Sequence, residues 1–242
     1  MTPGVVLRSS LFALIQVGAT VIFSIVALAT FPLDLRARYR VITLWSRLIL
    51  WAAEGICGIR YRVLGAERLP APPYIVLSKH QSAWETLAFQ VIFPPQVWVV
   101  KRELLWIPFF GWGLAMLSPI AIDRGSGRRA LRQMLEQGRD RLAQGFCVVI
   151  FPEGTRVAPG ERGEYQLGGA WLGSRTGVPV VPVAHNSGEV WRRNAFLKFP
   201  GTITVSIGAS IETEGISAEA LNGQVAEWIE TEMTRISTAS GQ

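Results

Sequence analysis

The first 60 residues of the chain are dominated by apolar side chains. Residues 10–31 carry no charge, and about 20 such residues in a helix, at ~1.5 Å each, suffice to cross the hydrocarbon core of a bilayer. Residues 41–59 are also apolar but include Arg47 and Glu54. They predict an amphipathic helix that packs or lies at an interface, not a second span. The alternative is a helical hairpin that enters one leaflet without crossing it.

From about residue 60, short apolar runs alternate with helical patterns. Strands are predicted at residues 61–65, 74–77, 97–100, 146–150, 178–184 and 202–207. The run at 146–150 is apolar throughout, as in a strand buried on both faces, whereas 202–207 alternates as in a half-exposed strand. Pro179 and Pro182 indicate that the strand at 178–184 starts at an edge of the sheet.

Helices are predicted between and after these strands. They cover residues 84–92, residues 128–142 and a C-terminal segment that Ser217 caps. The apolar stripe of the last helix consists of Leu221, Val225, Trp228, Ile229, Met233 and Ile236. This alternation predicts an α/β fold with a mixed, largely parallel sheet covered by helices. We expect residues 1–59 to form a membrane-associated helical segment and residues 60–242 an α/β domain.

Composition and charge narrow the class of partner. Hydrophobic residues make up 49% of the 242, and nine are tryptophan, which is more apolar than is usual for a freely soluble protein. The net charge of +6 comes mostly from arginines mixed with aromatic and aliphatic residues, which favours an anionic membrane surface over a nucleic acid. Cys57 and Cys147 lie in apolar runs without metal-ligand spacing, so we expect buried reduced thiols and no zinc site.

His80 and Glu85 are the most specific chemical signal. His80 follows the apolar run at 74–77 and is one of only two histidines. A neutral imidazole can take a proton from a hydroxyl, and a carboxylate can fix its tautomer and stabilise the imidazolium. Five residues apart, the two side chains would not share one face of a helix, so their pairing requires His80 to precede a helix that carries Glu85. Ser82 suits such a helix start. The alternative is an ordinary histidine near an unrelated surface glutamate.

A second signal is the hexapeptide Phe151–Arg156, which follows the buried run at 146–150. Its proline and glycine predict a tight turn, where the backbone can approach a ligand closely. Arg156 offers a planar fork for a phosphate, and Glu153 can accept a hydrogen bond from a hydroxyl. Taken alone, such a hexapeptide also fits a solvated turn.

Polar clusters follow three of the predicted strands: His80, then Lys101 with its neighbours, then the hexapeptide. Ligands of open α/β sheets bind at the carboxyl ends of strands, so these clusters are expected to converge. Lys101, Arg102 and Arg124 are further phosphate candidates. His185 ends another strand and is interpreted as a polar strand-end residue, not a catalytic one. The chain contains no P-loop motif, no dinucleotide fingerprint and no nucleophile elbow.

Together these segments resemble the glycerophospholipid acyltransferases, and among them the lysophosphatidic acid acyltransferases. The resemblance runs from about residue 74 to residue 184 and consists of four blocks in the expected order. They are His80-Gln-Ser-Ala-Trp-Glu85, Lys101 to Arg124, Phe151–Arg156 and the proline-containing run 178–183. The first block usually reads His-x4-Asp, so Glu85 lengthens the carboxylate by one methylene, which we take as a tolerated variant.

The resemblance implies a mechanism and a set of roles. His80 would deprotonate the free glycerol hydroxyl of a lysophospholipid, and Glu85 would orient His80. The hydroxyl oxygen would then attack an acyl thioester of coenzyme A or acyl carrier protein directly, without a metal or other cofactor. The implied substrate-binding residues are Lys101, Arg124, Glu153, Gly154, Thr155 and Arg156. The expected location is the inner (cytoplasmic) membrane with the catalytic part facing the cytoplasm, because arginines follow the apolar segment.

Two questions stay open at this level. The acceptor could instead be glycerol 3-phosphate or another lysolipid, and a catalytically silent membrane-binding protein is the alternative from another class. The apolar stretch 104–122 is interrupted by Pro108, Pro119 and several glycines, which argues against a straight helix. It predicts either a folded core segment or an acyl-chain wall that dips into a membrane.

Overall fold

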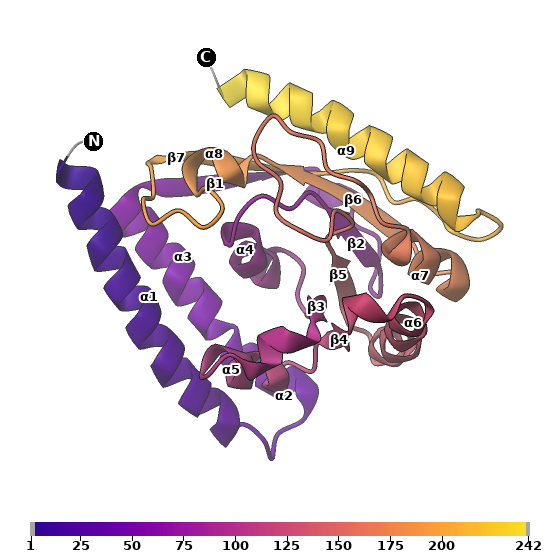
Figure 1. The fold of residues 1–242 in the computed structure, drawn as a ribbon, viewed down its shortest axis with the longest axis horizontal. Helices are drawn as coiled ribbons and strands as arrows, with labels where there is room; N and C mark the ends of the chain where they lie inside the picture. The colour runs from indigo at the N-terminus through magenta and orange to yellow at the C-terminus, as the bar shows by residue number, and fades with distance from the viewer. Residues whose placement is uncertain (1–2, 241–242) are drawn as a thin grey trace.

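The structure, a computed structural model, describes residues 3–240. Figure 1 shows three N-terminal helices on one side of a sheet and the C-terminal helix on the other. The N-terminal elements are α1 (Pro3–Ala29), α2 (Leu35–Ile42), α3 (Leu44–Cys57), β1 (Ile59–Leu64), η1 (Ala66–Arg68), β2 (Ile75–Ser78) and α4 (Trp84–Ile92). The middle of the chain forms β3 (Gln96–Lys101), η2 (Arg102–Trp106), α5 (Phe110–Met116), β4 (Ile120–Ile122), η3 (Arg124–Ser126), α6 (Arg128–Ala143) and β5 (Cys147–Ile150). The C-terminal part forms α7 (Gly168–Thr176), β6 (Val180–His185), α8 (Ser187–Val190), β7 (Gly201–Ile207) and α9 (Ala218–Ser240).

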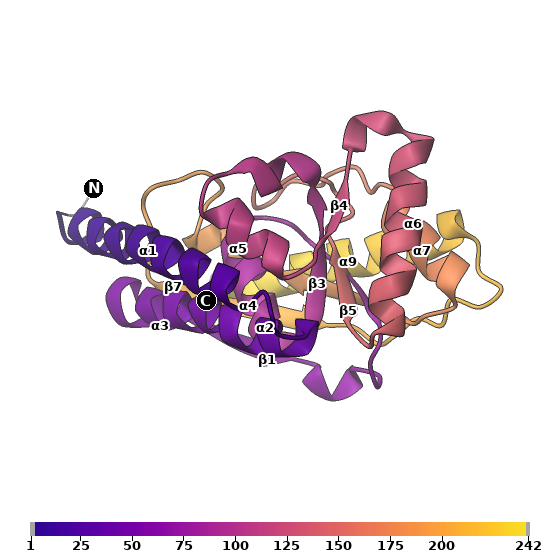
Figure 2. The same ribbon diagram turned by 90° about the horizontal axis from the view of Figure 1, so that it is seen from below.

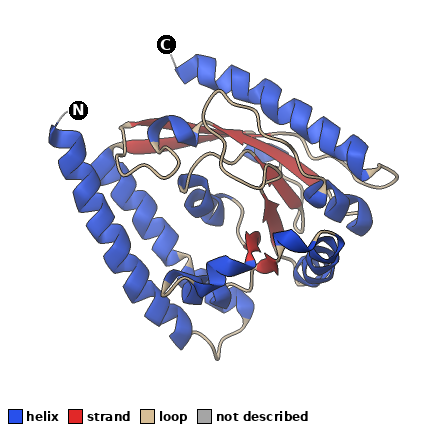
Figure 3. Cartoon of the chain, in the orientation of Figure 1, coloured by secondary structure: helices blue, strands red, loops and turns tan. Residues whose placement is uncertain are grey.

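The strands form one seven-stranded sheet in the order β1-β7-β6-β2-β5-β3-β4. Every neighbouring pair is parallel except β6 and β7, which pair antiparallel. Parallel neighbours need helical crossovers, and these crossovers cover both faces of the sheet (Figure 3). The predicted class, a mixed and largely parallel sheet covered by helices behind an apolar N-terminal helix, is confirmed.

Side chains of the central strands point alternately into two cores, one on each face of the sheet. Val76, Val149 and Val181 face the core that α1, α3 and α4 complete. Their neighbours Ile75 and Val148 face the core beneath α6, α7 and α9. This period of two explains why these strands are apolar at every position.

Helices α1 and α3 pack mainly into the first of these cores, whereas the buried apolar residues of α2, Tyr39 and Ile42, belong to the second. Phe12 of α1 and Ile49 of α3 are buried in the first core beside residues of the central strands. Figures 1 and 2 both show α1 outermost, alongside α3 and α5. Helices α1, α2 and α3 make up most of residues 3–57, and they share their cores with the α/β part. The packed helix predicted at 41–59 corresponds to α3, which is shorter, because α2 ends at Ile42 before it and β1 begins at Ile59 after it.

The outward face of α1 is apolar. The helix is long and apolar enough to cross a membrane by length and composition. Its exposed large side chains are Val6, Leu7, Leu11, Leu14, Val17, Ile22, Ile25, Val26 and Leu28. In water such a surface is unfavourable, so α1 presents a face that needs an apolar environment.

Two predictions about strands are wrong, for physical reasons. β7 is buried along most of its length, because it lies between β1 and β6 and its polar side chains are paired inside the fold. Thr204 accepts a hydrogen bond from Arg62, for example. β6 is central although it contains Pro182. The missing N–H of Pro182 faces the side where β7 has already ended, at Ile207, so no ladder bond is lost there.

The apolar stretch 104–122 is not a core segment throughout. It forms part of η2, then α5 and β4, and carries several exposed aromatic side chains. Trp106 is 68% exposed, and Trp112 is 41% exposed. Leu114 and Leu117 of the same stretch line a cavity. The segment therefore has an apolar outer surface and an inner wall.

Candidate active site

The site lies where β2, β3, β5 and β6 end. These four strands are mutually parallel, so the loops that follow them leave the same edge of the sheet. Lys79 and His80 follow β2, Lys101 ends β3, and Phe151–Arg156 follows β5. The expected convergence of the three polar clusters is observed. His185 ends β6 and joins them from the other side.

His80 and Glu85 are in direct contact. The ring Nδ1 of His80 lies 2.8 Å from Oε1 of Glu85. His80 precedes α4 and Glu85 lies in its first turn, as the pairing requires. Ser82 supports this helix start, because its hydroxyl accepts a hydrogen bond from the Trp84 N–H at 2.8 Å. The chain thus turns between the two residues, which brings side chains that a regular helix would separate onto one side.

Glu85 is fully buried and its carboxylate is surrounded by donors. Oε1 accepts hydrogen bonds from the N–H groups of Gln81 and Ser82, besides the one from His80. Oε2 accepts hydrogen bonds from the hydroxyls of Ser82 and Ser187. Burial by itself would raise the pKa of Glu85, but the imidazoles of His185 and His80 and the hydrogen bonds bring this pKa well below the ordinary 4.5. The group is therefore ionised at neutral pH.

The tautomer of His80 follows from this charge. An ionised carboxylate only accepts hydrogen bonds, so Nδ1 of His80 must carry the proton. In the neutral ring with this tautomer, Nε2 keeps a lone pair that can accept a proton from a bound hydroxyl. The ring stacks on Phe151, with centroids 3.9 Å apart and planes inclined by 10°. The imidazole is therefore held by a hydrogen bond at one edge and by an aromatic ring on one face.

His185 is the last residue of β6, which agrees with its interpretation as a polar strand-end residue. It is fully buried, and its Nε2 donates to the carbonyl oxygen of Lys79 at 2.8 Å. Burial lowers the pKa of His185 from 6.5, against the opposing influence of Glu85, so the ring is neutral at neutral pH. Its role is to hold the backbone directly before His80.

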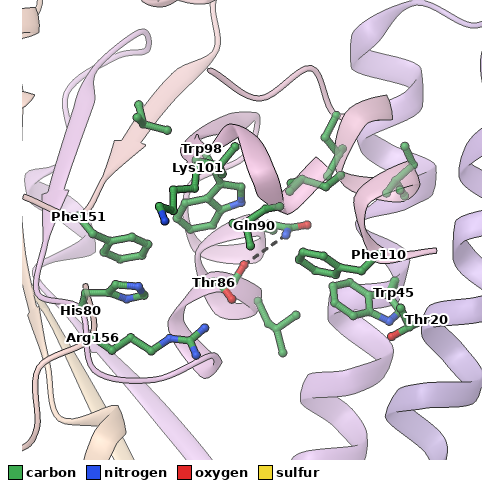
Figure 4. A pocket seen from close by; sticks show the side chains of 18 of the residues that line it. Thr20, Trp45, His80, Thr86, Gln90, Trp98, Lys101, Phe110, Phe151 and Arg156 are labelled. Atoms are coloured by element: carbon green, nitrogen blue, oxygen red, sulfur yellow. Dashed lines mark hydrogen bonds between the residues drawn. The ribbon is translucent and has the colours of Figure 1, made fainter. Parts of the chain in front are cut away.

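A cavity of about 440 Å³ opens beside His80. Figure 4 shows His80, Phe151 and Arg156 at one end and Phe110, Trp45 and Thr20 at the other. Most of the wall between them is apolar, and α1, α3, α4, β3 and α5 supply it. The apolar lining includes Phe23, Trp45, Leu87, Trp98, Leu104, Phe110, Leu114 and Leu117. One opening therefore joins a proton acceptor to an apolar chamber.

Cationic side chains gather at the His80 end of this cavity. Lys101, Arg124, Arg156 and Arg193 all line it, as do Gly154 and Thr155. Arg124 donates a hydrogen bond to the carbonyl oxygen of Gly154. Arg193 donates to the carbonyl oxygen of Arg156 at 2.6 Å. The Nε of Arg156 has no partner among the described residues. This end of the cavity is suited to an anion such as a phosphate.

Glu153 was expected to contact a substrate, but its side chain lies inside the protein. Its side chain is fully buried and does not line the cavity. Oε1 accepts a hydrogen bond from the ammonium of Lys79 at 2.7 Å, and Oε2 accepts one from the His80 N–H at 3.0 Å. Both carboxylate oxygens are engaged inside the protein, so the expectation that Glu153 contacts a substrate does not fit this geometry.

Three side chains of the site were not predicted from the sequence. Ser187 follows β6 and bonds to Glu85 across 102 positions of the chain. Arg193 lies in the loop after α8, and Phe151 provides the stacking surface for His80. Only Phe151 had a local signal, since it opens the hexapeptide. The other two are brought to the site by the sheet topology alone.

Among residues 3–240, no group of three or more His, Cys, Asp or Glu side chains is placed to hold a metal ion.

Comparisons with known proteins agree with this geometry. The acyltransferase family model matches residues 60–186. The chain is 43% identical to the 1-acyl-sn-glycerol-3-phosphate acyltransferase of Pseudomonas aeruginosa over 96% of its length and 92% of that protein. It is 32% identical to the human 1-acyl-sn-glycerol-3-phosphate acyltransferase alpha over 79% of its length and 70% of the human protein. The crystal structure of the 1-acyl-sn-glycerophosphate acyltransferase PlsC from Thermotoga maritima has the same fold, with a TM-score of 0.80, 23% identity and coverage of 96% and 95%.

Proposed function

The chain belongs to the acyltransferase family, and on this premise we propose that it acylates the free hydroxyl of 1-acyl-sn-glycerol 3-phosphate, forming phosphatidic acid. The family and the names of its relatives support this acceptor. The observation that carries the proposal is the contact of His80 Nδ1 with the buried Glu85 carboxylate, beside a cavity that has cations at one end and an apolar chamber at the other.

The reaction needs one proton acceptor and no covalent enzyme intermediate. Nε2 of His80 takes the hydroxyl proton as the oxygen attacks the thioester carbonyl carbon. The new C–O bond forms, the C–S bond breaks, and the imidazolium returns the proton to the departing thiolate. The buried charge of Glu85 stabilises the imidazolium while it exists. The donor is an acyl thioester of coenzyme A or of acyl carrier protein.

The acceptor's two ends match the two ends of the cavity. Lys101, Arg124 and Arg156 neutralise the phosphate, with Arg193 beside them. Gly154 and Thr155 line the same end and face the glycerol. The apolar chamber accepts an acyl chain, which leaves water for a wall of aliphatic and aromatic side chains.

We further propose that the protein works at the cytoplasmic membrane. The exposed apolar face of α1 and the exposed Trp106 favour insertion into lipid, and the positive net charge favours an anionic surface. Arg36, Arg38 and Arg40 follow α1, which orients the rest of the chain toward the cytoplasm. A lysolipid acceptor could then reach the cavity without leaving the membrane.

Acyl transfer in detergent micelles tests the proposal. Labelled acyl-coenzyme A and acyl carrier protein are supplied in separate reactions, each with lysophosphatidic acid, glycerol 3-phosphate or lysophosphatidylcholine. We expect transfer to lysophosphatidic acid, and a ~10²–10⁴-fold lower rate for His80→Ala. Glu136→Ala, an exposed site on α6, is the matched control and keeps full activity. Transfer only to another acceptor overturns the proposed substrate, and no transfer from either donor favours a silent membrane-binding protein.

A further inference from the structure

Lys79, the residue before His80, is a buried cation. Its side chain is 1% exposed, although it lies next to a residue that lines the cavity. The ammonium donates to Oε1 of Glu153 at 2.7 Å, to Oε1 of Glu230 at 2.9 Å and to the carbonyl oxygen of Glu161 at 3.1 Å. All three of its N–H groups are thereby used inside the protein. Lys79 is thus not available to a substrate phosphate.

The same network fixes the backbone of His80. Glu153 accepts from the Lys79 ammonium with one oxygen and from the His80 N–H with the other. The Gly163 N–H donates to Glu153 as well, at 3.2 Å. Glu153 therefore fixes two consecutive residues after β2, while Glu85 holds the His80 ring from the opposite side.

Glu230 brings the C-terminal helix into this network. It lies on α9, outside the residues that the family model matches. Its Oε1 accepts from Lys79 and from the Tyr165 hydroxyl, the latter at 2.8 Å. The burial of Tyr165 and its bond to Glu230 raise the pKa of the phenol, so Tyr165 remains a donor at every physiological pH. One ammonium is thus shared between two carboxylates.

We propose that Glu230 is a positioning residue for acyl transfer, which acts through Lys79 and Glu153 on the peptide that carries His80. The proposal rests on the function proposed above. Without the Glu230 carboxylate, Lys79 loses one of two counter-ions and a cavity opens beside it. Lys79 and Glu153 then readjust, and the His80 N–H that Glu153 accepts moves with them. A displacement of about 1 Å at a reacting group can lower a rate by ~10²-fold.

Three variants of α9 separate positioning from simple stability. Glu230→Ala removes the acceptor, and we expect a ~10–100-fold lower kcat with KM for lysophosphatidic acid within about twofold. Glu230→Gln keeps a carbonyl oxygen that can accept from both Lys79 and Tyr165, so it is expected to retain most of the activity. Glu227→Ala changes an exposed residue of the same helix and is expected to behave like the unaltered protein.

The imidazole spectrum provides a readout that needs no turnover. The chain has two histidines, so nitrogen-15 labelling of histidine gives one Nδ1–H signal for His80 and one Nε2–H signal for His185. We expect Glu230→Ala to shift or broaden the His80 signal, and Glu230→Gln to restore it. An unchanged signal with unchanged kcat in Glu230→Ala overturns the inference, as does a lower melting temperature with normal kcat in the folded fraction. A shifted signal in a protein that acylates no lysolipid supports the coupling and refutes the proposed function instead.

Discussion

Glu85→Gln is the sharpest test of the mechanism, because it removes one charge with almost no change in shape. The glutamine amide has an oxygen that accepts and an NH₂ group that donates. The hydrogen-bond partners around position 85 determine which of the two faces His80. Three N–H donors face Oε1, whereas only hydroxyls, which can rotate and accept, face Oε2. The glutamine oxygen is therefore expected to face His80, and its NH₂ group Ser82 and Ser187. The tautomer of His80 survives, and only the charge behind it is lost.

The magnitude follows from the distance between the charges. With Nδ1 and Oε1 2.8 Å apart, the charge centres of an imidazolium and the carboxylate lie about 4 Å apart. At an effective dielectric constant near 20 their attraction is about 4 kcal/mol. The neutral imidazole lacks this attraction, so most of it is gained as the proton arrives. A loss of about 4 kcal/mol corresponds to a ~10³-fold lower kcat.

The assay is steady-state acyl transfer to lysophosphatidic acid, with kcat and KM determined separately. We expect KM to stay within about threefold, because Glu85 is buried and does not line the cavity. Thermal unfolding confirms that the variant is folded at the assay temperature. A kcat within about tenfold of the unaltered protein refutes the reasoning, since the charge of Glu85 then contributes little to catalysis.

Other predictions concern neighbouring groups. Ser187→Ala leaves Oε2 of the buried Glu85 with one hydroxyl donor fewer, and we expect kcat to fall ~3–10-fold at constant KM. Arg156→Ala should raise KM for lysophosphatidic acid ~10–100-fold but leave any transfer to an acceptor without a phosphomonoester nearly unchanged. The pKa of Glu85 is lower in the folded protein than the ordinary 4.5 of the unfolded chain, so the ionised carboxylate stabilises the fold above pH 4.5. This stabilisation is lost as the pH falls from 4.5 towards the lower pKa of the folded state. The melting temperatures of the unaltered protein and Glu85→Gln should therefore converge below pH 4.5. Replacing the exposed Trp106 and Ile107 by serine should weaken sedimentation with anionic vesicles ~10-fold while activity in micelles stays within about twofold.

Local patterns predicted the parts of the site that are local in the chain. His80, Ser82 and Glu85 lie within six positions, and one strand, one turn and one helix start determine how they meet. The strand-end position of the hexapeptide and of Lys101 followed in the same way, because an all-apolar run predicts a buried parallel strand. Burial of His185 was compatible with its place at the end of β6.

The predictions that differ from the structure concern residues whose surroundings come from distant parts of the chain. The alternation of β7 resembled a half-exposed strand because polar side chains such as Thr204 and Ser206 occur at every second position. Both are buried, since they bond to Arg62 and Glu232 from elements far away in the chain. Glu153 looked like a substrate ligand for the same reason. Nothing within the hexapeptide shows that Lys79, 74 positions earlier, occupies its carboxylate.

Glu85 and Glu153 have different partners, which explains how a site for an anionic lipid can contain two buried carboxylates. A phosphate needs cations that are free, and Arg156 and Lys101 line the cavity without an ion pair to any carboxylate of residues 3–240. Had Glu153 faced the cavity, its charge would have repelled the phosphate and competed for Arg156. Buried against Lys79, it leaves the cavity lining positive and at the same time fixes the backbone of His80. Glu85, the carboxylate that our proposal assigns to the reaction, is fully buried, contacts the His80 ring and does not line the cavity, so in this proposal it stabilises an imidazolium from outside the anion site.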